Sequence, residues 1–341
     1  MGLFSFLTQE IAIDLGTANT IIVQDNKIVV DEPSIVALNR RTGEVIAIGE
    51  KARQMHGKTH DKIVTVRPLR DGVIADFNAA ELMIRGMIKM IKSKNQLFAS
   101  SSLKMVVCIP SGSTEVEIRA VRDSSEHAGA REVYMVHEPM AAAIGIGIDV
   151  LAPEGNMIVD IGGGTTEIAV ISLGGIVCNK SIRIAGDDFT DDIQEYMRHQ
   201  HNIKIGDRTA EEIKLHVGSA LSELDEPPEN FIVRGPHQMT ALPVEIPVTY
   251  QEIAHCLDKS LTKVEAAIIG VLEETPPELY ADIFRNGIYL AGGGALLLGL
   301  SKRVAEKTNI SVHVADDPLH AVARGTGISL KNIDKFTFLL R

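Results

Sequence analysis

Short apolar runs along the chain end at acidic and small residues, and one such arrangement occurs twice. Residues 11–13 and 157–159 are apolar, and each run is followed by an acidic residue, a turn rich in glycine and threonine, and a second apolar run at 21–23 or 168–171. Short apolar runs bounded by turn residues are typical of buried strands. The pattern therefore predicts two strand–turn–strand units, 160 − 14 = 146 residues apart, and so a duplicated fold whose halves face each other across a cleft.

Between the two units the apolar positions alternate between strand and helix spacing. Residues 82–91 and 116–127 have helical spacing, whereas 105–109 and 133–136 predict strands, the first of them ending at Pro110. Glu138 and Pro139 open a further helix, whose alanines and glycines give it a face of small residues for close packing. This alternation indicates an α/β fold, and we expect the helix after Glu138 to cross between two lobes.

The second half predicts the same plan with different insertions. Residues 34–66 are mixed in character and predict a small inserted subdomain, and the polar stretch 186–250 predicts a helix-rich counterpart in the second half. A helix over 253–271 follows, then a strand over 288–290, a glycine cluster and a helix from about residue 297. We interpret the acidic pairs at 187–188 and 191–192 as the solvated first turn of a helix and not as a metal site.

Composition narrows the classes of protein that fit. With 341 residues the chain is long enough for two lobes, and 45% hydrophobic with 23% charged residues is ordinary for a globular protein. No apolar run approaches the roughly 20 residues of a membrane span, and no signal-like segment begins the chain, so we expect a cytoplasmic protein. The three cysteines lack zinc-site spacing, and a net charge of −11 without basic clusters excludes a general nucleic-acid role.

The two turns have the chemistry of a phosphate cradle. In each, an acid ends the strand, small residues let backbone N–H groups approach an anion, and threonine hydroxyls add donors. One such turn fits an ordinary glycine hairpin equally well, but a facing pair predicts a polyphosphate site. Strand-forming residues follow both turns, whereas dinucleotide-binding and Walker loops require a helix there. A third cluster, at 292–295, lies between a strand and a helix and is also suited to a phosphate or a base.

Five stretches together resemble the actin, Hsp70 and sugar-kinase superfamily, and within it the MreB family of bacterial actins. They are residues 13–20, 137–145, 160–172, 209–214, and 317–319 with 322–325. They follow the family's order over nearly the whole chain. One departure is His137, because MreB proteins more often carry an acid before the equivalent of Glu138.

The resemblance implies roles for individual residues. Asp14 and Asp160 would hold Mg²⁺ through its waters, and Glu138, helped by Thr165, would polarise the attacking water. ATP would be held by the two turns, a helical segment and the third glycine cluster: Gly16, Thr17, Ala18 and Asn19; Gly162, Gly163, Gly164 and Thr165; Glu211, Glu212, Ile213 and Lys214; and Gly292, Gly293, Gly294, Ala295 and Leu296.

Taken singly, several of these residues have simpler explanations. A carboxylate at a helix start, such as Glu138, is favoured by the helix dipole alone. Glu211 and Lys214 are three residues apart and fit a solvent-exposed helix pair. Only the joint pattern makes Glu138, Asp14 and Asp160 candidate active-site residues.

Two apolar segments suggest a membrane-facing side. Leu3, Phe4, Phe6 and Leu7 precede the first core strand, and Leu97 and Phe98 stand in a polar loop. A disordered or core-docked N-terminus explains the first segment equally well. The resemblance favours membrane binding, since MreB filaments lie on the inner membrane through such segments. Because the net charge opposes binding to anionic lipid, apolar insertion would have to supply most of the affinity, and a filament would add avidity.

The resemblance implies an actin-like fold with four subdomains around a nucleotide cleft. Its bounds would be 1–33, 67–149 and 318–341 for subdomain IA, 34–66 for IB, 150–184 and 252–317 for IIA, and 185–251 for IIB. It implies a slow Mg-dependent ATPase that assembles into filaments on the inner face of the cytoplasmic membrane and organises cell-wall elongation with membrane proteins.

Two other functions belong to the same superfamily. A sugar or metabolite kinase is the alternative, although the sequence offers no clear base for an acceptor hydroxyl. A chaperone of the Hsp70 type would need a peptide-binding domain after the nucleotide-binding one, and we do not expect one in 341 residues.

Overall fold

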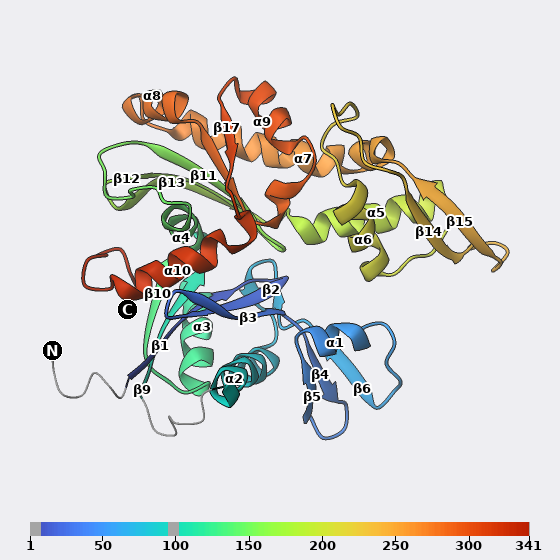
Figure 1. The fold of residues 1–341 in the computed structure, drawn as a ribbon, viewed down its shortest axis with the longest axis horizontal. Helices are drawn as coiled ribbons and strands as arrows, with labels where there is room; N and C mark the ends of the chain where they lie inside the picture. Colours follow the sequence, from blue (N-terminus) through green and yellow to red (C-terminus); the bar gives the residue numbers. More distant parts are fainter. Residues whose placement is uncertain (1–7, 95–101, 341) are drawn as a thin grey trace.

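The computed structural model describes residues 8–94 and 102–340, and two five-stranded sheets of the same topology form its centre (Figure 1). In each sheet a first strand pairs antiparallel with the next strand, which pairs antiparallel with a third, while two later strands add in parallel on the other side. The first sheet has the order β10-β9-β1-β2-β3 and the second β13-β12-β11-β16-β17. This repetition confirms the predicted duplication.

The strands of the two sheets correspond one to one. Those of the first sheet are β1 (Thr8–Leu15), β2 (Asn19–Gln24), β3 (Lys27–Pro33), β9 (Ser102–Ile109) and β10 (Ala130–His137). Those of the second sheet are β11 (Asn156–Ile161), β12 (Thr166–Ser172), β13 (Gly175–Ile182), β16 (Ile288–Ala291) and β17 (Val312–Val314). We call the part built on the first sheet lobe I and the part built on the second sheet lobe II. Every residue of β11 and β12 is buried, as expected for central strands covered on both faces.

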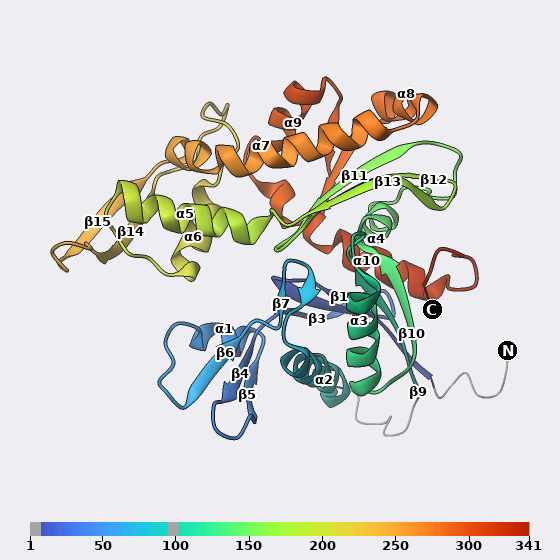
Figure 2. The same ribbon diagram turned by 180° about the vertical axis from the view of Figure 1, so that it is seen from behind.

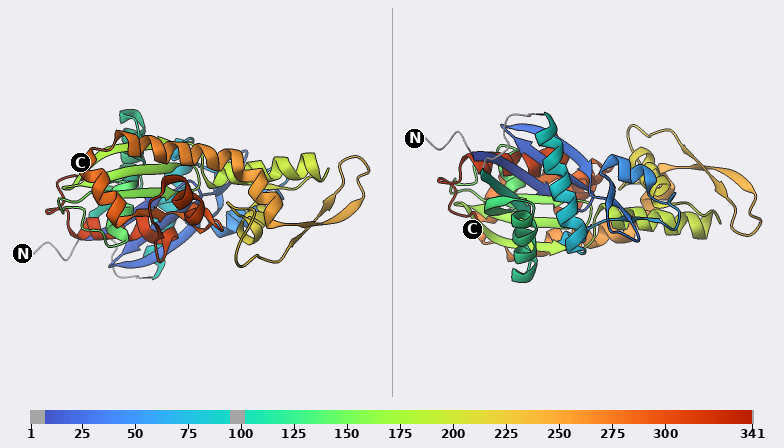
Figure 3. Two further views of the ribbon diagram at one scale, coloured as in Figure 1. Left: turned by 90° about the horizontal axis from the view of Figure 1, so that it is seen from above. Right: turned by 90° about the horizontal axis from the view of Figure 1, so that it is seen from below.

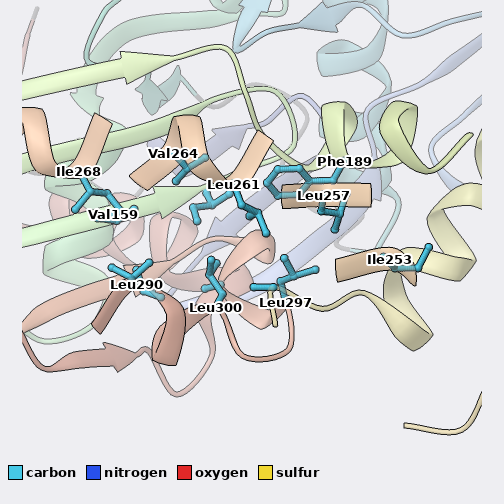
Figure 4. Close-up of a cluster of buried hydrophobic side chains, with 14 of the residues drawn as sticks. Val159, Phe189, Ile253, Leu257, Leu261, Val264, Ile268, Leu290, Leu297 and Leu300 are labelled. Carbon is cyan, nitrogen blue, oxygen red and sulfur yellow. The ribbon is translucent and has the colours of Figure 1, made fainter. Parts of the chain in front are cut away.

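Helices cover the outer faces of both sheets. Lobe I carries α2 (Phe77–Lys94) and α3 (Glu115–His127), and lobe II carries α7 (Tyr250–Glu274), α8 (Pro277–Asn286) and α9 (Leu300–Thr308). Capping boxes fix the starts of α3, through Thr114 and Glu117, and of α7, through Thr249 and Glu252. In Figure 4 the apolar side chains of α7 point toward Val159 and Leu290 of the second sheet and toward Leu300 of α9, and all of these residues are buried.

Two helices lie between the sheets, as Figures 1 and 2 show: α4 (Glu138–Gly145) and α10 (Ala321–Lys331). Their backbones touch, because a Cβ on Gly145 would overlap the carbonyl oxygen of Ala321, and one on Gly325 would overlap that of Ala141. One buried cluster contains these helices together with residues of both sheets. This arrangement confirms that the helix after Glu138 crosses between the lobes.

Each lobe carries an insertion, and both insertions lie toward the end of the molecule opposite the chain termini (Figure 3). In lobe I it is a three-stranded sheet, β5-β4-β6, with one short helix: β4 (Val36–Asn39), β5 (Val45–Ile48), α1 (Glu50–Met55) and β6 (Ile63–Val66). In lobe II it comprises α5 (Gly186–Gln200), α6 (Asp207–Val217), β14 (Phe231–Pro236) and β15 (Pro243–Val248). The hairpin β14–β15 was not predicted, because each of its strands buries only one residue, Val233 in β14 and Val248 in β15.

The segment after β16 also differs from its prediction. A 3₁₀ turn, η2 (Gly293–Leu296), follows the strand, and α9 begins at Leu300 and not near residue 297. The cause is local, because Gly299 has φ 74°, in the left-handed region, and sets the helix start. The remaining elements are the small hairpin β7 (Leu69–Arg70) and β8 (Val73–Ile74) and the 3₁₀ turn η3 (Pro318–His320).

Candidate functional site

The two glycine-rich turns meet face to face between the lobes. A Cβ on Gly163, in the second turn, would lie 2.8 Å from Cβ of Ala18 in the first turn, and one on Gly164 would lie 2.6 Å from Oγ1 of Thr17. Side chains at these positions would therefore push the turns apart. The hairpin β7–β8 also reaches them, since the Gly72 N–H donates to Oγ1 of Thr17 at 3.0 Å. The structure thus brings together the turns that the sequence places 146 residues apart.

An acidic residue stands near the end of the first strand of each unit. Asp160 on β11 is 5% exposed, and its Oδ1 is buried without a hydrogen-bond partner among the residues that the structure describes. Asp14 on β1 accepts a hydrogen bond from the Cys108 thiol at 3.0 Å. Burial raises the pKa of Asp14 to about 6 and that of Asp160 to about 8, and the charge of Asp14 adds to the second shift.

Glu138 begins α4 and belongs to the same acidic group. Burial raises its pKa well above the ordinary value, and the charges of Glu167, Asp160 and Asp14 raise it further. His137, before it, has a pKa lowered mainly by burial, and its Nδ1 has no partner within the described part of the chain. Four carboxyl groups from the two lobes thus lie close enough to interact electrostatically, and no ion pair joins any of them to a described residue. Such a cluster requires protons or a cation.

Glu167 is a site residue that the sequence reasoning missed. It is fully buried on β12 and lies directly opposite Asp160 in the β11–β12 register. The backbone N–H and the hydroxyl of Ser111 and the hydroxyl of Ser181 all donate to its carboxylate. A signal was present, because a tight turn at 162–165 pairs 161 with 166 and 160 with 167, which places both carboxylates on one face.

The predicted sugar and base side is built from α5 and α6. The Lys214 ammonium donates to the Gly186 carbonyl at 2.7 Å and to Oγ1 of Thr190 at 2.9 Å, and it pairs with Glu211 at 2.7 Å. Glu211 and Lys214 therefore share one face of α6, as expected. Their neighbours point elsewhere, because Glu212 pairs with Arg208 on the surface and Ile213 is buried in the core of lobe II.

The third glycine cluster lies directly beside Asp160. Gly292 has φ 77°, and a Cβ there would come within 2.5 Å of Oδ1 of Asp160, so any side chain would cover the carboxylate. Its own N–H donates to the Pro318 carbonyl and is not available to a phosphate. Gly293 and Gly294 continue the 3₁₀ turn, in which Ala295 is buried and Leu296 is 53% exposed.

The start of α5 links the second turn to lobe I. The N–H groups of Gly186 and Asp187 donate to the carbonyls of Gly162 and Gly163 at 3.1 and 2.7 Å. Asp187 also pairs with Arg67 of lobe I at 2.7 Å, and Arg67 lies 3.5 Å from the Thr17 carbonyl. Two other acids of α5 bond within lobe II: Asp188 accepts from the Ala185 N–H, and Asp192 accepts from the Ser260 hydroxyl of α7. Over residues 8–94 and 102–340, no group of three or more acidic, histidine or cysteine side chains has the arrangement of a metal site.

The membrane predictions fall on other parts of the chain. Leu3, Phe4, Phe6, Leu7, Leu97 and Phe98 lie outside the described residues. The helices in residues 8–94 and 102–340 are all too short or too polar to cross a bilayer.

Comparison with known proteins places these features in one family. The model of the family described as "MreB/Mbl protein" matches residues 8–337 of this chain. The chain is 47% identical over 338 residues to the cell shape-determining protein MreB of Escherichia coli K12, covering 98% of this chain and 95% of that protein. It is 45% identical over 328 residues to the cell shape-determining protein Mbl of Bacillus cereus, covering 96% and 97%.

Solved structures show the same fold. MreB 5 of Spiroplasma citri bound to AMPPNP superposes with a TM-score of 0.89 at 39% identity, covering 96% of this chain and 97% of that one. The same protein bound to ADP also superposes with a TM-score of 0.89, at 38% identity. A MamK double helical filament matches with a TM-score of 0.78 at 21% identity, over 96% of this chain and 99% of that one. The two sheets and the helices around them are therefore an actin-like fold, as expected.

Proposed function

The chain belongs to the MreB/Mbl protein family, and we propose that it is a slow Mg-dependent ATPase whose hydrolysis is coupled to filament assembly. It is an actin-like filament protein that determines cell shape, like its relatives from Escherichia coli and Bacillus. The Spiroplasma structures bound to AMPPNP and ADP support nucleotide binding in a fold of this kind.

The proposed ATP site lies where the two turns meet. Gly16 to Asn19 and Gly162 to Thr165 would bind the phosphates through their N–H groups and hydroxyls. Lys214 and Glu211 would face the ribose and the adenine from α6, and residues 292–296 would close the site beside Asp160. The contact between the two turns supports this role, because it brings backbone N–H groups and hydroxyls from both halves of the chain to one site.

The acidic residues present fit a divalent cation. Asp160 has a buried carboxylate oxygen without a partner among the described residues, and Asp14 adds a second carboxylate. Two carboxylates suit Mg²⁺, which keeps several of its waters. When bound, the ion would neutralise charge on the phosphates. The remaining chemistry belongs to Glu138, which would accept a hydrogen bond from the attacking water, and to the Thr165 hydroxyl, which would help to orient that water.

The convergence of Asp14, Glu138 and Asp160 behind the turns is the observation that carries this proposal, and two variants test it. We expect Glu138→Ala to bind ATP with unchanged affinity but to lose phosphate release, because the water-orienting carboxylate is gone. We expect Asp160→Ala to weaken Mg-ATP binding itself. Glu195→Ala, which removes an exposed ion pair on α5, is the matched control and should behave like the parent. A Glu138→Ala protein with undiminished phosphate release contradicts the assignment.

We further propose that filaments of this protein lie on the inner face of the cytoplasmic membrane and organise cell-wall elongation with membrane proteins there. The MamK filament, which has the same fold, supports self-assembly. The register Thr8↔Ser102 supports a shared membrane side, because the two strands that follow these segments in the sequence begin side by side. The residue bounds of the four subdomains given above also remain our proposal.

Liposome sedimentation tests the membrane contact. We expect a protein that lacks residues 1–7 and carries Leu97→Ser and Phe98→Ser to lose most of its lipid binding, because apolar insertion supplies the affinity of such a segment. Ser100→Ala is the control within the same loop. Equal pelleting of the variant and the parent would refute the assignment.

A further inference from the structure

A hydrogen-bond network around Glu167 joins the two lobes behind the glycine-rich turns. Glu167 belongs to lobe II, on β12, whereas Ser111 belongs to lobe I, directly after β9 and Pro110. Ser111 donates to the Glu167 carboxylate from its N–H, at 2.9 Å, and from its hydroxyl. Asn179 on β13 of lobe II donates to the Ser111 hydroxyl at 2.9 Å. We call these bonds among Ser111, Glu167 and Asn179 the interlobe clamp.

The clamp connects the residues that flank the proposed reaction site. In lobe I, β9 and β10 pair in parallel with Ile109 opposite His137, so Ser111 follows one strand end and Glu138 follows its neighbour. In lobe II, Glu167 lies opposite Asp160 in the β11–β12 register. The clamp therefore joins the end of β9, next to the strand end that bears Glu138, to the hairpin that bears Asp160 and Thr165.

The clamp consists of hydrogen bonds to a buried carboxyl group. Glu167 is fully buried, forms no ion pair with a described residue, and accepts three hydrogen bonds from Ser111 and Ser181. Bonds to a buried carboxylate are stronger than neutral bonds, and leaving such a group unsatisfied is costly. On its outer side, Ser111, Asn179 and His137 line a cavity of about 280 Å³, so the lobes are not packed solidly there. At this point, hydrogen bonds between the lobes add to the apolar packing of the cluster between the sheets.

We propose that Ser111 and Glu167 are positioning residues for hydrolysis: their bonds across the lobes hold Glu138 in line with Asp160 and Thr165. This inference rests on the proposed ATPase activity. Both turns bind phosphate through their own backbones, so nucleotide binding does not need the clamp. The placement of a water-orienting group does need it, because displacements of about 1 Å reduce rates by about a hundredfold.

Ser181 provides a matched control. Its hydroxyl donates to the same carboxylate at 2.5 Å, but it stands on β13 in lobe II and so does not join the lobes. Ser111→Ala removes a hydroxyl that donates to Glu167 across the lobes and accepts from Asn179, whereas Ser181→Ala removes one that donates to Glu167 within lobe II. Only the first change weakens the clamp. Glu167→Gln preserves the volume of the side chain, so it is a second test in which the substitution leaves no empty space.

The experiment measures the Kd for ATP and the rate of single-turnover phosphate release for the full-length parent and these variants, with the thermal midpoint as a folding check. We expect Ser111→Ala and Glu167→Gln to release phosphate about tenfold more slowly with Kd changed less than twofold. We expect Ser181→Ala to stay within about twofold of the parent in both quantities.

Equal rates in Ser111→Ala and Ser181→Ala, or a loss of ATP binding in Ser111→Ala, would overturn the inference. A parent protein without Mg-ATP-dependent phosphate release would instead overturn the proposed function, and the unmodified protein reports that outcome before any variant is compared.

Discussion

Replacing Asp160 by asparagine should stabilise the metal-free protein while weakening its binding of Mg-ATP. Asp160 is buried with an unpartnered oxygen, and burial raises its pKa from 3.8 to about 8. Between these two pH values the folded protein holds a proton that the unfolded chain has released, so the free energy of unfolding falls as the pH rises. Below pH 3.8 both states are protonated, and above about pH 8 both are ionised.

The size of the effect follows from the shift. At pH 7 the pH lies about three units above the pKa of the unfolded chain and still below that of the folded protein. One unit corresponds to about 1.4 kcal/mol, so the buried carboxyl group lowers the free energy of unfolding by at most about 4 kcal/mol. Because the structure relaxes around the carboxyl group, we expect Asp160→Asn to raise the free energy of unfolding by about 2–4 kcal/mol. With an unfolding entropy of about 2.1 cal/mol/K per residue, a chain of 341 residues gains roughly 1.4 °C in Tm per kcal/mol. We therefore expect Tm to rise by about 3–6 °C.

Thermal unfolding in EDTA at pH 7 and pH 5 measures this effect. The gain of Asp160→Asn over the parent should be largest at pH 7 and shrink to about 1–2 kcal/mol at pH 5, because the unfolded carboxyl group is then closer to its own pKa. The same variant should bind Mg-ATP more weakly at pH 7. A variant that is less stable than the parent in EDTA, or equally stabilised at both pH values, would contradict a raised pKa of Asp160 in the metal-free protein.

Two further predictions concern the helix crossing between the sheets and an ion pair between the lobes. In urea unfolding, Gly325→Ala should destabilise the protein by about 3 kcal/mol or more, because its Cβ would overlap the Ala141 carbonyl. Gly206→Ala is the control: the space around Gly206 is open, so the stability should change by less than about 1 kcal/mol. A double-mutant cycle on Arg67 and Asp187, whose side chains are each 37% exposed, should give a coupling of about 0.5–1 kcal/mol that falls with salt; a coupling independent of salt would contradict the ion pair.

Local patterns predicted the framework of the fold. The two strand–turn–strand units, the strand ending at Pro110 and the helix opening at Glu138 and Pro139 all follow from residues within a few positions of each other. Short-range physics decides such features: buried strands need continuous apolar runs, proline ends a strand, and small residues permit a close helix crossing. The duplication was visible because both units carry an aspartate, a glycine two positions later and a threonine six positions later.

The sequence did not reveal the partners that meet across long separations. Arg67 and Asp187 are 120 residues apart, and Ser111 and Glu167 are 56 apart, so no local pattern pairs them. The sequence marked Glu167 only as one residue of the stretch 160–172, although the hairpin register places it opposite Asp160. The hairpin β14–β15 was missed for a different reason: it is a two-stranded ribbon that buries few residues, and prolines begin and end its turn.

Sedimentation coupled to phosphate release tests the central claim most directly. Purified protein is incubated with and without Mg-ATP and with and without lipid vesicles, and both the pellet and the released phosphate are measured. The account predicts nucleotide-dependent polymer that pellets with lipid and releases phosphate slowly. A soluble monomer that releases no phosphate until a small hydroxyl-bearing metabolite is added would contradict it.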